Sequence, residues 1–324
     1  MNPVVRSTLG KTLGLVETQR GGDTIMHAPG VPPARTDRPR GVAVLRLRGH
    51  DVAEYVWEPD LPLSASPRPY LHPVRTLAGV TVTDAAPDSH PHQFGISVAA
   101  PDLDGCNFWG GRTFVAGHGP AWLDNHGTQH HQRWLRRTNT ELHHTLEWAD
   151  PRRATLLREQ RSITCRPVDD TAWSLSVHSR LTNATDRPLP WRTPAALGRV
   201  GAGYGGIFWR GPAFAGAAQV LSPDGADVQR VHGQAADWVA VTGRDRDGRS
   251  WTTLFTHAEE SGARDRWFVR ARDYLGVCSS PAWDEPLVLA PGESIDRQVV
   301  TVVIDGAVTA ATAAELAGTA RSAA

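Results

Sequence analysis

The feature that most limits what this chain can fold into is a long succession of short, strand-like segments. From Val42 onward the segments are rich in Val, Thr, Trp or Leu, and most are bounded by Gly, Pro, Asp or Asn, as in GVTVTDA, AWSLSVHSRLTN and DRQVVTVVID. Such runs between turn residues are typical of strands. No ten-residue helical pattern alternates with them, which argues against a doubly wound α/β sheet. The sequence therefore predicts an all-β fold, a large antiparallel β-sandwich with a short C-terminal helix.

The strand-like pattern defines one predicted domain at residues 40–306. A β-sandwich of roughly 250 residues can form a single domain, so the length of the chain does not require two. Residues 1–39 contain several Gly and Pro pairs and no sustained periodicity, so we expect a flexible leader there. Met26 is an alternative start of translation, in which case the leader is not translated in full.

Turn signals and an alanine-rich end complete the predicted layout. Asp247-Gly248 in TGRDRDGRSW predicts one hairpin, and Pro291-Gly292 in LAPGESIDRQ predicts another. Residues 307–324 are alanine-rich and predict a terminal helix that starts near Val308 and frays after Gly318.

Composition excludes several classes of protein. Lys+Arg and Asp+Glu both total 34, so no net charge attracts nucleic acid or an anionic membrane. Lys11 is the one lysine, which leaves little scope for Schiff-base chemistry. The three cysteines are too sparse for a disulfide framework, and no apolar run approaches the ~18 residues of a membrane span. We expect a soluble cytoplasmic protein.

The segment SHPHQFG places two imidazoles, His90 and His92, just before an apolar strand. If the strand is regular, both share a face with Phe94, Ile96 and Val98 and point inward, because side chains alternate along a strand. Imidazole titrates near neutrality and is costly to bury without a partner. The pair is therefore a candidate for ligand binding or acid–base chemistry, and structural hydrogen bonding is the alternative.

The segment LLREQRSITC places a carboxylate and a guanidinium on an otherwise apolar face. Glu159 and Arg161 share parity with Leu157, Ile163 and Cys165, so both should point inward. A buried charged pair must be satisfied by its own members or by a ligand. Glu159 is a candidate general base and Arg161 a candidate for orienting substrate oxygens, with a structural ion pair as the alternative.

The remaining candidates are polar or aromatic residues expected near these two segments. His130 is the preferred histidine of its cluster because it shares parity with His126 and Trp134. The chain has 12 Trp and 4 Tyr, and exposed indole faces can stack on sugar rings. The predicted substrate-binding residues are Tyr70, His72, Trp109, His130, Trp209 and Arg210.

Several motifs together indicate a family resemblance. The segments RPYLHPVRTLAGVTVT, DSHPHQFGISVA, DGCNFWGG and LLREQRSI occur in this order, followed by a closing LAPGES. The series, over roughly residues 40–306, resembles a bacterial family called methane oxygenase PmoA-like, whose function is unknown. The resemblance implies a β-rich domain. The membrane subunit from which that name derives is an apolar helical protein, and nothing in this chain matches it.

The closing L-x-P-G-E-S segment also resembles the end of galactose-mutarotase-like supersandwiches. That resemblance is at the level of fold. It implies sugar binding on a concave sheet by histidines, a carboxylate and an arginine.

The combined expectation is a carbohydrate-active protein that performs proton transfer on a sugar or keto-sugar, as an isomerase, epimerase, lyase or hydratase. In that hypothesis His90 and His92 act as acid, base or binding groups, Glu159 is the carboxylate, and Arg161 orients oxygens. One alternative is a non-catalytic sugar-binding or sensing module. Another is a metal-dependent oxygenase or hydrolase that uses His90, His92 and His130. No cofactor or metal ligand set is predicted, although a divalent metal is one option to test, and the expected partner is a small sugar-derived molecule.

Overall fold

The computed structural model describes residues 41–213, 217–259 and 264–323. The expected flexible leader, residues 1–39, lies outside the described residues. The described residues form one compact unit. The described part of this unit is built from antiparallel strands, so the all-β expectation is confirmed.

The first large sheet has seven strands, each antiparallel to its neighbours. In spatial order they are β1 (Gly41–Leu47), β2 (His50–Glu58), β3 (Tyr70–Val74), β4 (Ile96–Ala99), β13 (Gly206–Arg210), β18 (Leu275–Ser280) and β17 (Arg266–Ala271).

The second large sheet has eight strands and is also antiparallel throughout. In spatial order they are β14 (Gln219–Leu221), β15 (Trp238–Arg244), β16 (Ser250–His257), β20 (Ser294–Asp305), β11 (Ala172–Asn183), β10 (Thr155–Pro167), β9 (Glu141–Ala149) and β8 (Thr128–Arg137).

Shorter elements complete the described fold. A three-stranded sheet contains β19 (Leu287–Leu289), β12 (Leu189–Arg192) and β5 (Asp102–Leu103), and a hairpin contains β6 (Thr113–Val115) and β7 (Gly119–Ala121). The helical elements are a 3-10 turn (Leu63–Ala65), α1 (Val228–Val231) and α2 (Ala310–Ser322). Within the described residues no helix has the length and apolar character of a membrane span.

One apolar core joins the inner faces of the two large sheets. Alternate residues of each strand supply it, for example Leu71 of β3, Val98 of β4 and Ile163 of β10, all at most 4% exposed. The alternation follows from the period of two along a strand. The other face of the seven-stranded sheet carries Trp109 and Phe208 in a smaller cluster. This arrangement leaves polar and aromatic side chains on the outer face of that sheet.

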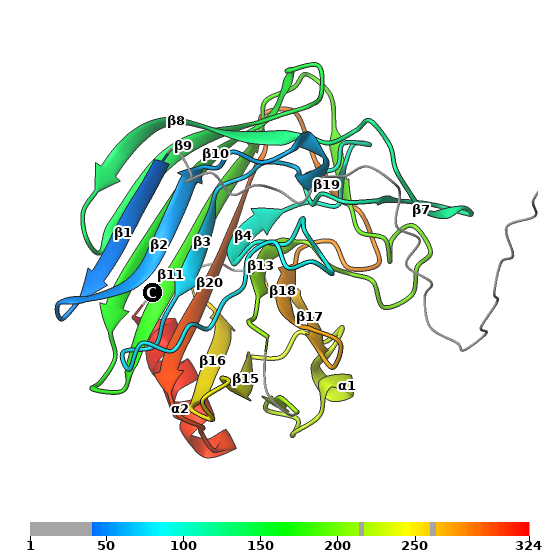
Figure 1. Ribbon diagram of the computed structural model, residues 1–324. Helices are drawn as coiled ribbons and strands as arrows, with labels where there is room; N and C mark the ends of the chain where they lie inside the picture. Colours follow the sequence, from blue (N-terminus) through cyan, green and yellow to red (C-terminus); the bar gives the residue numbers. More distant parts are fainter. Residues whose placement is uncertain (1–40, 214–216, 260–263, 324) are drawn as a thin grey trace, which may run out of the picture. The chain divides into compact units, whose positions relative to one another are not determined.

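Helix α2 covers part of the outer face of the eight-stranded sheet, beside β15 and β16 (Figure 1). Its buried alanines, Ala313, Ala317 and Ala320, recur at helical spacing and pack in a cluster with residues of β16 and β20. Thr309 is the N-cap, and its side chain accepts a hydrogen bond from the Thr312 amide. The predicted helix is confirmed, but fraying after Gly318 is wrong because tertiary packing carries it to Ser322.

The two predicted hairpins have different outcomes. Asp247-Gly248 joins β15 to β16 as expected, with Arg244 opposite Ser250 and Gly248 at φ +79°. Pro291-Gly292 does form a turn, but β19 pairs with β12 while β20 pairs with β11 and β16. The second hairpin prediction is therefore wrong, because the strands on either side of the turn enter different sheets.

Candidate functional site

The segment SHPHQFG is a turn and not the start of a strand. The amide of His90 donates to the Pro87 carbonyl at 2.8 Å, and the amide of Gln93 donates to the His90 carbonyl at 3.0 Å. Gly95 adopts φ +26°, and β4 begins only at Ile96. The expectation that both imidazoles share the inward face of a regular strand is therefore wrong, because Gly95 interrupts the alternation.

The interruption places Phe94 and Ile96 on opposite faces of the seven-stranded sheet. Ile96 belongs to the core between the sheets. The Phe94 ring instead stacks on Tyr70, with ring centroids 5.1 Å apart. Tyr70 faces away from the core, because its neighbour Leu71 is a core residue and adjacent residues of a strand point to opposite faces. The turn at residues 87–93 consequently lies over the outer face of this sheet.

The turn brings both histidines close to β13 and to the residue that precedes β18. The His90 ring lies 4.9 Å from the Tyr274 ring and 6.0 Å from the His92 ring, measured between centroids. The guanidinium of Arg210, at the end of β13, lies 4.5 Å from the Tyr274 ring centre. Its Nη1 donates to Gln93 Oε1 at 2.8 Å. We call these five residues the histidine–arginine cluster.

Glycines leave room for the His92 ring. A Cβ on Gly110 would lie 2.8 Å from the His92 Cβ, and a Cβ on Gly111 would lie 2.8 Å from its Nδ1. The carbonyl of Gly111 also accepts a hydrogen bond from His126 Nε2 at 2.7 Å. The GG of DGCNFWGG therefore serves to seat His92 beneath this loop.

Arg68 holds the turn from below. It is fully buried, and its guanidinium donates to four neutral acceptors. These acceptors are Ser97 Oγ at 3.3 Å, the carbonyl oxygens of Ala65 and Ser66 at 3.0 and 3.1 Å, and the carbonyl oxygen of His92 at 2.9 Å. Burial, together with the charge of Arg161, lowers the pKa of Arg68 to about 9.

The imidazoles of the cluster are neutral at physiological pH. Burial lowers the pKa of His92 to about 3, and the nearby cations Arg68 and Arg210 act in the same direction. Burial also lowers the pKa of His90, with Arg210 adding to the effect and Asp273 opposing it. A neutral imidazole can accept a proton or a hydrogen bond from a ligand.

Tyr70 and His72, both predicted to bind substrate, lie next to this cluster on β3. Both side chains are partly buried. His72 Nδ1 is 2.9 Å from Thr83 Oγ1, and burial lowers its pKa. The structure thus brings His90, His92 and Arg210 together, with Tyr70 and His72 on the adjacent strand.

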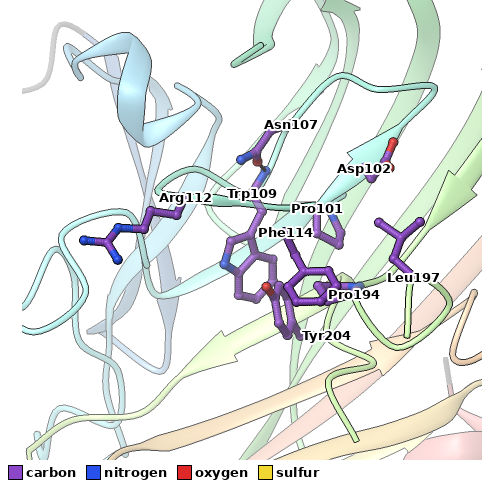
Figure 2. Close-up of a pocket in the computed structure, with 9 residues that line it drawn as sticks. All are labelled: Pro101, Asp102, Asn107, Trp109, Arg112, Phe114, Pro194, Leu197 and Tyr204. Atoms are coloured by element: carbon purple, nitrogen blue, oxygen red, sulfur yellow. Dashed lines mark hydrogen bonds between the residues drawn. The ribbon is translucent and has the colours of Figure 1, made fainter. Parts of the chain in front are cut away.

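Trp109 lies beside the cluster but is largely covered. It is 5% exposed and contacts Tyr204 and Phe208 at centroid distances of 4.7 and 4.8 Å. Figure 2 shows Trp109 and Tyr204 together in a small pocket, with Arg112 extending away from them.

A larger open groove of about 400 Å³ lies further along the same sheet. It is lined by residues of α1 and by the end of β17, including His232, Arg270 and Asp273. Asp273, at one end of the groove, is the neighbour of Tyr274 in the chain, and its charge acts on His90 of the histidine–arginine cluster. A volume of this size is in the range of small-molecule sites.

Trp209 does not lie at the site. It is 2% exposed, packs against Trp251 and Phe255 between the sheets, and donates from Nε1 to the Val82 carbonyl at 2.9 Å. The expectation of a stacking wall is wrong, because adjacent residues of a strand face opposite ways and Arg210 takes the outward position.

The prediction that His130 faces inward and binds substrate is not supported by its position. It is exposed on β8, and Thr128 Oγ1 is 2.6 Å from its Nε2. Register shifts after His131 and after Trp134 change the phase of β8, so His131 and not His130 faces inward with Trp134. The buried histidine near His92 is His126, which the parity argument ranked below His130.

Glu159 and Arg161 face inward as predicted, but between the two large sheets. Both are at most 2% exposed, and Arg161 binds the carboxylate through Nε and Nη2, each at 2.7 Å. Trp148 Nε1 donates to Glu159 Oε2 at 2.7 Å, and Ser179 Oγ donates to Oε1 at 2.6 Å. Four hydrogen bonds satisfy the carboxylate, so the geometry is that of a structural ion pair and not of a free base.

The same network continues from Arg161 to the edge of the core. Arg161 Nη1 donates to the Tyr55 hydroxyl at 3.3 Å, and that oxygen lies 2.8 Å from His144 Nε2. His144 Nδ1 lies 2.9 Å from His131 Nδ1. Arginine can only donate, so the Tyr55 oxygen accepts from Arg161. With the Tyr55 hydroxyl proton donated to His144 Nε2, the acceptor that lies 2.8 Å away, His144 donates from Nδ1 to His131. His144 is therefore neutral, and burial lowers its pKa to about 2.

Acid should destabilise the fold through His144. Below about pH 6.5 the unfolded chain binds a proton at this residue that the folded chain does not, so unfolding is favoured as pH falls. We expect His144 to account for about 2 kcal/mol of stability lost between pH 7.5 and pH 5. Urea unfolding of the wild type and His144→Gln at both pH values measures this. An equal loss in the two proteins would contradict the assignment.

Gly95 should be intolerant of any side chain. A Cβ there would overlap the Leu71 carbonyl oxygen, in addition to the strain of positive φ. We expect Gly95→Ala to lower the free energy of unfolding by at least about 2 kcal/mol. Gly79 also has positive φ but open space around it, so Gly79→Ala should cost only about 1 kcal/mol. If the two substitutions lower the free energy of unfolding in urea equally, the close approach of the Leu71 carbonyl to Gly95 is unimportant.

Metal binding finds no support in the part of the chain that the structure describes. No group of three or more His, Cys, Asp or Glu side chains in those residues could hold a metal ion. The alternative based on His90, His92 and His130 is wrong in its geometry, because His130 projects from a strand of the other sheet.

The fold and cluster define an antiparallel β-sandwich with a polar site on the outer face of one sheet. The chain belongs to a family of unknown function, DUF6807, whose model matches residues 43–318. That description contains no reference to methane oxygenase, so the PmoA-like name is not supported. No curated protein is significantly similar to the sequence.

Several solved structures are similar at low sequence identity. A protein from Escherichia coli K12, provisionally named an aldose 1-epimerase, is 9% identical, with 82% of this chain and 99% of that chain covered and a TM-score of 0.43. A similarly named protein from Klebsiella pneumoniae is 11% identical, with 56% and 55% covered and a TM-score of 0.31. A TPR-domain-containing protein from Parabacteroides distasonis is 12% identical, with 74% and 44% covered and a TM-score of 0.36.

Proposed function

We propose that this protein acts on a sugar or keto-sugar by proton transfer at the histidine–arginine cluster. The observation that carries the proposal is the pair of neutral imidazoles, His90 and His92, with ring centroids 6.0 Å apart and Arg210 beside them. A reacting group placed beside two rings at this separation is within reach of a nitrogen atom of each ring. The groove that ends at Asp273 provides room for the rest of the ligand.

Each residue has a distinct role in the proposed reaction. His92 takes a proton from a hydroxyl, or from a carbon next to a carbonyl, and the resulting imidazolium returns it, while the neutral His90 donates an N–H hydrogen bond to a ligand oxygen. Arg210 and the Tyr274 hydroxyl donate hydrogen bonds to ligand oxygens. Tyr70 and His72 of β3 lie at the edge of the bound molecule. Glu159 and Arg161 stabilise the sandwich, and have no direct part in the chemistry.

A non-catalytic sugar-binding module is the second candidate. It is favoured by one observation: Glu159, the carboxylate expected to act as base, is saturated by Trp148, Arg161 and Ser179 at a separate place in the core. A binding site needs only donors, acceptors and ring faces, all of which the cluster has.

A thermal-shift screen over neutral sugars, keto-sugars and sugar acids, followed by NMR of each stabilising compound, separates the two candidates. A ligand of the folded state raises its melting temperature by mass action. Stabilisation with conversion of the compound supports the enzyme, and stabilisation without conversion supports the module. If no compound stabilises the protein or is converted, both proposals are wrong.

The cytoplasmic location is part of the same proposal. Cys106, Cys165 and Cys278 are all free and buried, which suits a reducing compartment. Fractionation of the native cells, with the protein followed by immunoblot, tests the location.

A further inference from the structure

Arg210 lacks the counter-charge that a buried guanidinium needs. The residue is 5% exposed, its one hydrogen-bonded side-chain partner is the neutral amide of Gln93, and its buried Nε has no partner within the described structure. Asp84 is the acid that acts on it, but from beyond salt-bridge distance. Burial accordingly keeps the pKa of Arg210 below its ordinary value despite the opposing effect of Asp84. An unpaired buried cation is unfavourable unless a ligand completes it.

Arg68 adds a second cation beneath the same turn. Its described hydrogen bonds all go to neutral oxygens, and no carboxylate contributes to its pKa. Every charged group that acts on His92 is a cation or a potential cation. Asp273 is the acid that acts on His90, and it is exposed at the end of the groove. Two buried arginines, neither of them in a described salt bridge, therefore lie at the site, and the acids that act there, Asp84 and Asp273, stand beyond salt-bridge distance.

We propose that the ligand is an anionic sugar, and that Arg210 binds its carboxylate or phosphate group beside His90 and His92. This inference rests on the proposed function and specifies the substrate class. The unused Nε belongs to the planar edge of the guanidinium that matches two oxygens of a carboxylate or phosphate. The ligand's charge replaces the missing counter-charge of Arg210, and the sugar ring extends toward the groove at Arg270 and Asp273.

Titration calorimetry with matched compounds tests the charge preference. The probes are glucose with glucuronate and glucose 6-phosphate, and galactose with galacturonate and galactose 6-phosphate. We expect at least one anionic sugar to bind about tenfold or more tightly than its neutral partner, because hydrogen bonds to charged groups are the stronger ones. Preference for the uronate identifies a carboxylate site, and preference for the 6-phosphate identifies a phosphate site. Added NaCl should weaken the preference.

Variants locate the charge that is responsible. Arg210→Gln should abolish the preference, because it should weaken the anionic sugar about tenfold or more beyond any loss for its neutral partner. Arg210→Lys should retain part of the preference because charge remains without the planar fork. Arg180→Gln, which removes an exposed arginine from β11 of the other sheet, is the matched control and should change neither. Melting curves establish that each variant is folded. If Arg210→Gln does not fold, the preference for the anionic sugar is compared between Arg210→Lys and the wild type, and an unchanged preference would overturn the inference.

The outcomes separate this inference from the proposed function. Neutral sugars that bind as tightly as the anionic ones would overturn the inference and leave the proposed function standing. The same would follow if Arg210→Gln weakened neutral and anionic sugars equally. Absence of binding by every sugar would overturn both.

Discussion

Glu159→Ala is expected to lower the free energy of unfolding by about 3–5 kcal/mol. The substitution leaves the Arg161 guanidinium buried without its carboxylate and removes the acceptor of Trp148 Nε1 and Ser179 Oγ. An uncompensated charge inside the core is strongly destabilising. Equilibrium urea unfolding measures the loss, and a fall of roughly 10 °C in melting temperature should accompany it.

Glu147→Ala is the matched control for this substitution. Glu147 lies on β9, next to the strand of Glu159, and its side chain reaches Arg158 at 3.9 Å on the solvent side. Its loss should cost less than about 1 kcal/mol. If Glu159→Ala melts like the wild type but loses turnover, the carboxylate is catalytic and the structural assignment is wrong.

His92→Ala is expected to reduce turnover of the substrate by about 10²- to 10⁴-fold. His92 is the imidazole most enclosed by the site, seated under Gly110 and Gly111 and surrounded by cations that keep it neutral. Because its pKa is about 3, loss of activity on acidification from pH 8 to pH 5 should not come from this residue. Initial rates by NMR, on the compound that the thermal-shift screen identifies, give the comparison.

His130→Ala provides the control, since His130 is exposed on β8 of the other sheet. Its turnover should stay within about twofold of the wild type, and both variants should melt close to the wild type. Comparable losses in the two variants would mean that the reaction does not take place at the turn of residues 87–93.

The sheet architecture could be predicted because the signal is repeated along every strand. Alternating apolar residues in β10 and β11 assign one face to the core, and an inward charge such as Glu159 stands out against that pattern. The same logic left open whether Glu159 and Arg161 pair with each other or with a ligand. Only the positions of Trp148 and Ser179, from neighbouring strands, decide it.

The site could be predicted only in part, because single residues can change the phase of a strand. Gly95 at positive φ separates His92 from the alternation of β4, and the register shifts in β8 exchange the orientations of His130 and His131. Both changes depend on backbone conformations that the residue pattern does not encode. For the change at β4, the sequence did contain a signal, because Gly95 stands immediately before an apolar run.

Residues outside the histidine motif supply much of the site. Gln93 belongs to the motif itself. Arg68 lies well before the motif in the chain, and Tyr274, the residue before β18, lies far after it, so parity arguments within one segment cannot find these two residues. The signal available in the sequence for Arg68 was its place in a stretch without acidic residues between Asp60 and Asp84. The contact between Tyr274 and Arg210 depends on the pairing of β13 with β18.

The central claim is that ligand binds on the outer face of the seven-stranded sheet, around residues 87–93. Hydrogen–deuterium exchange with and without the sugar that most stabilises the protein tests it directly. We predict slower exchange in residues 87–95, in residues 107–112 and around Tyr274, with no change along β8. Protection confined to the eight-stranded sheet, or none at all at saturating ligand, would contradict the account.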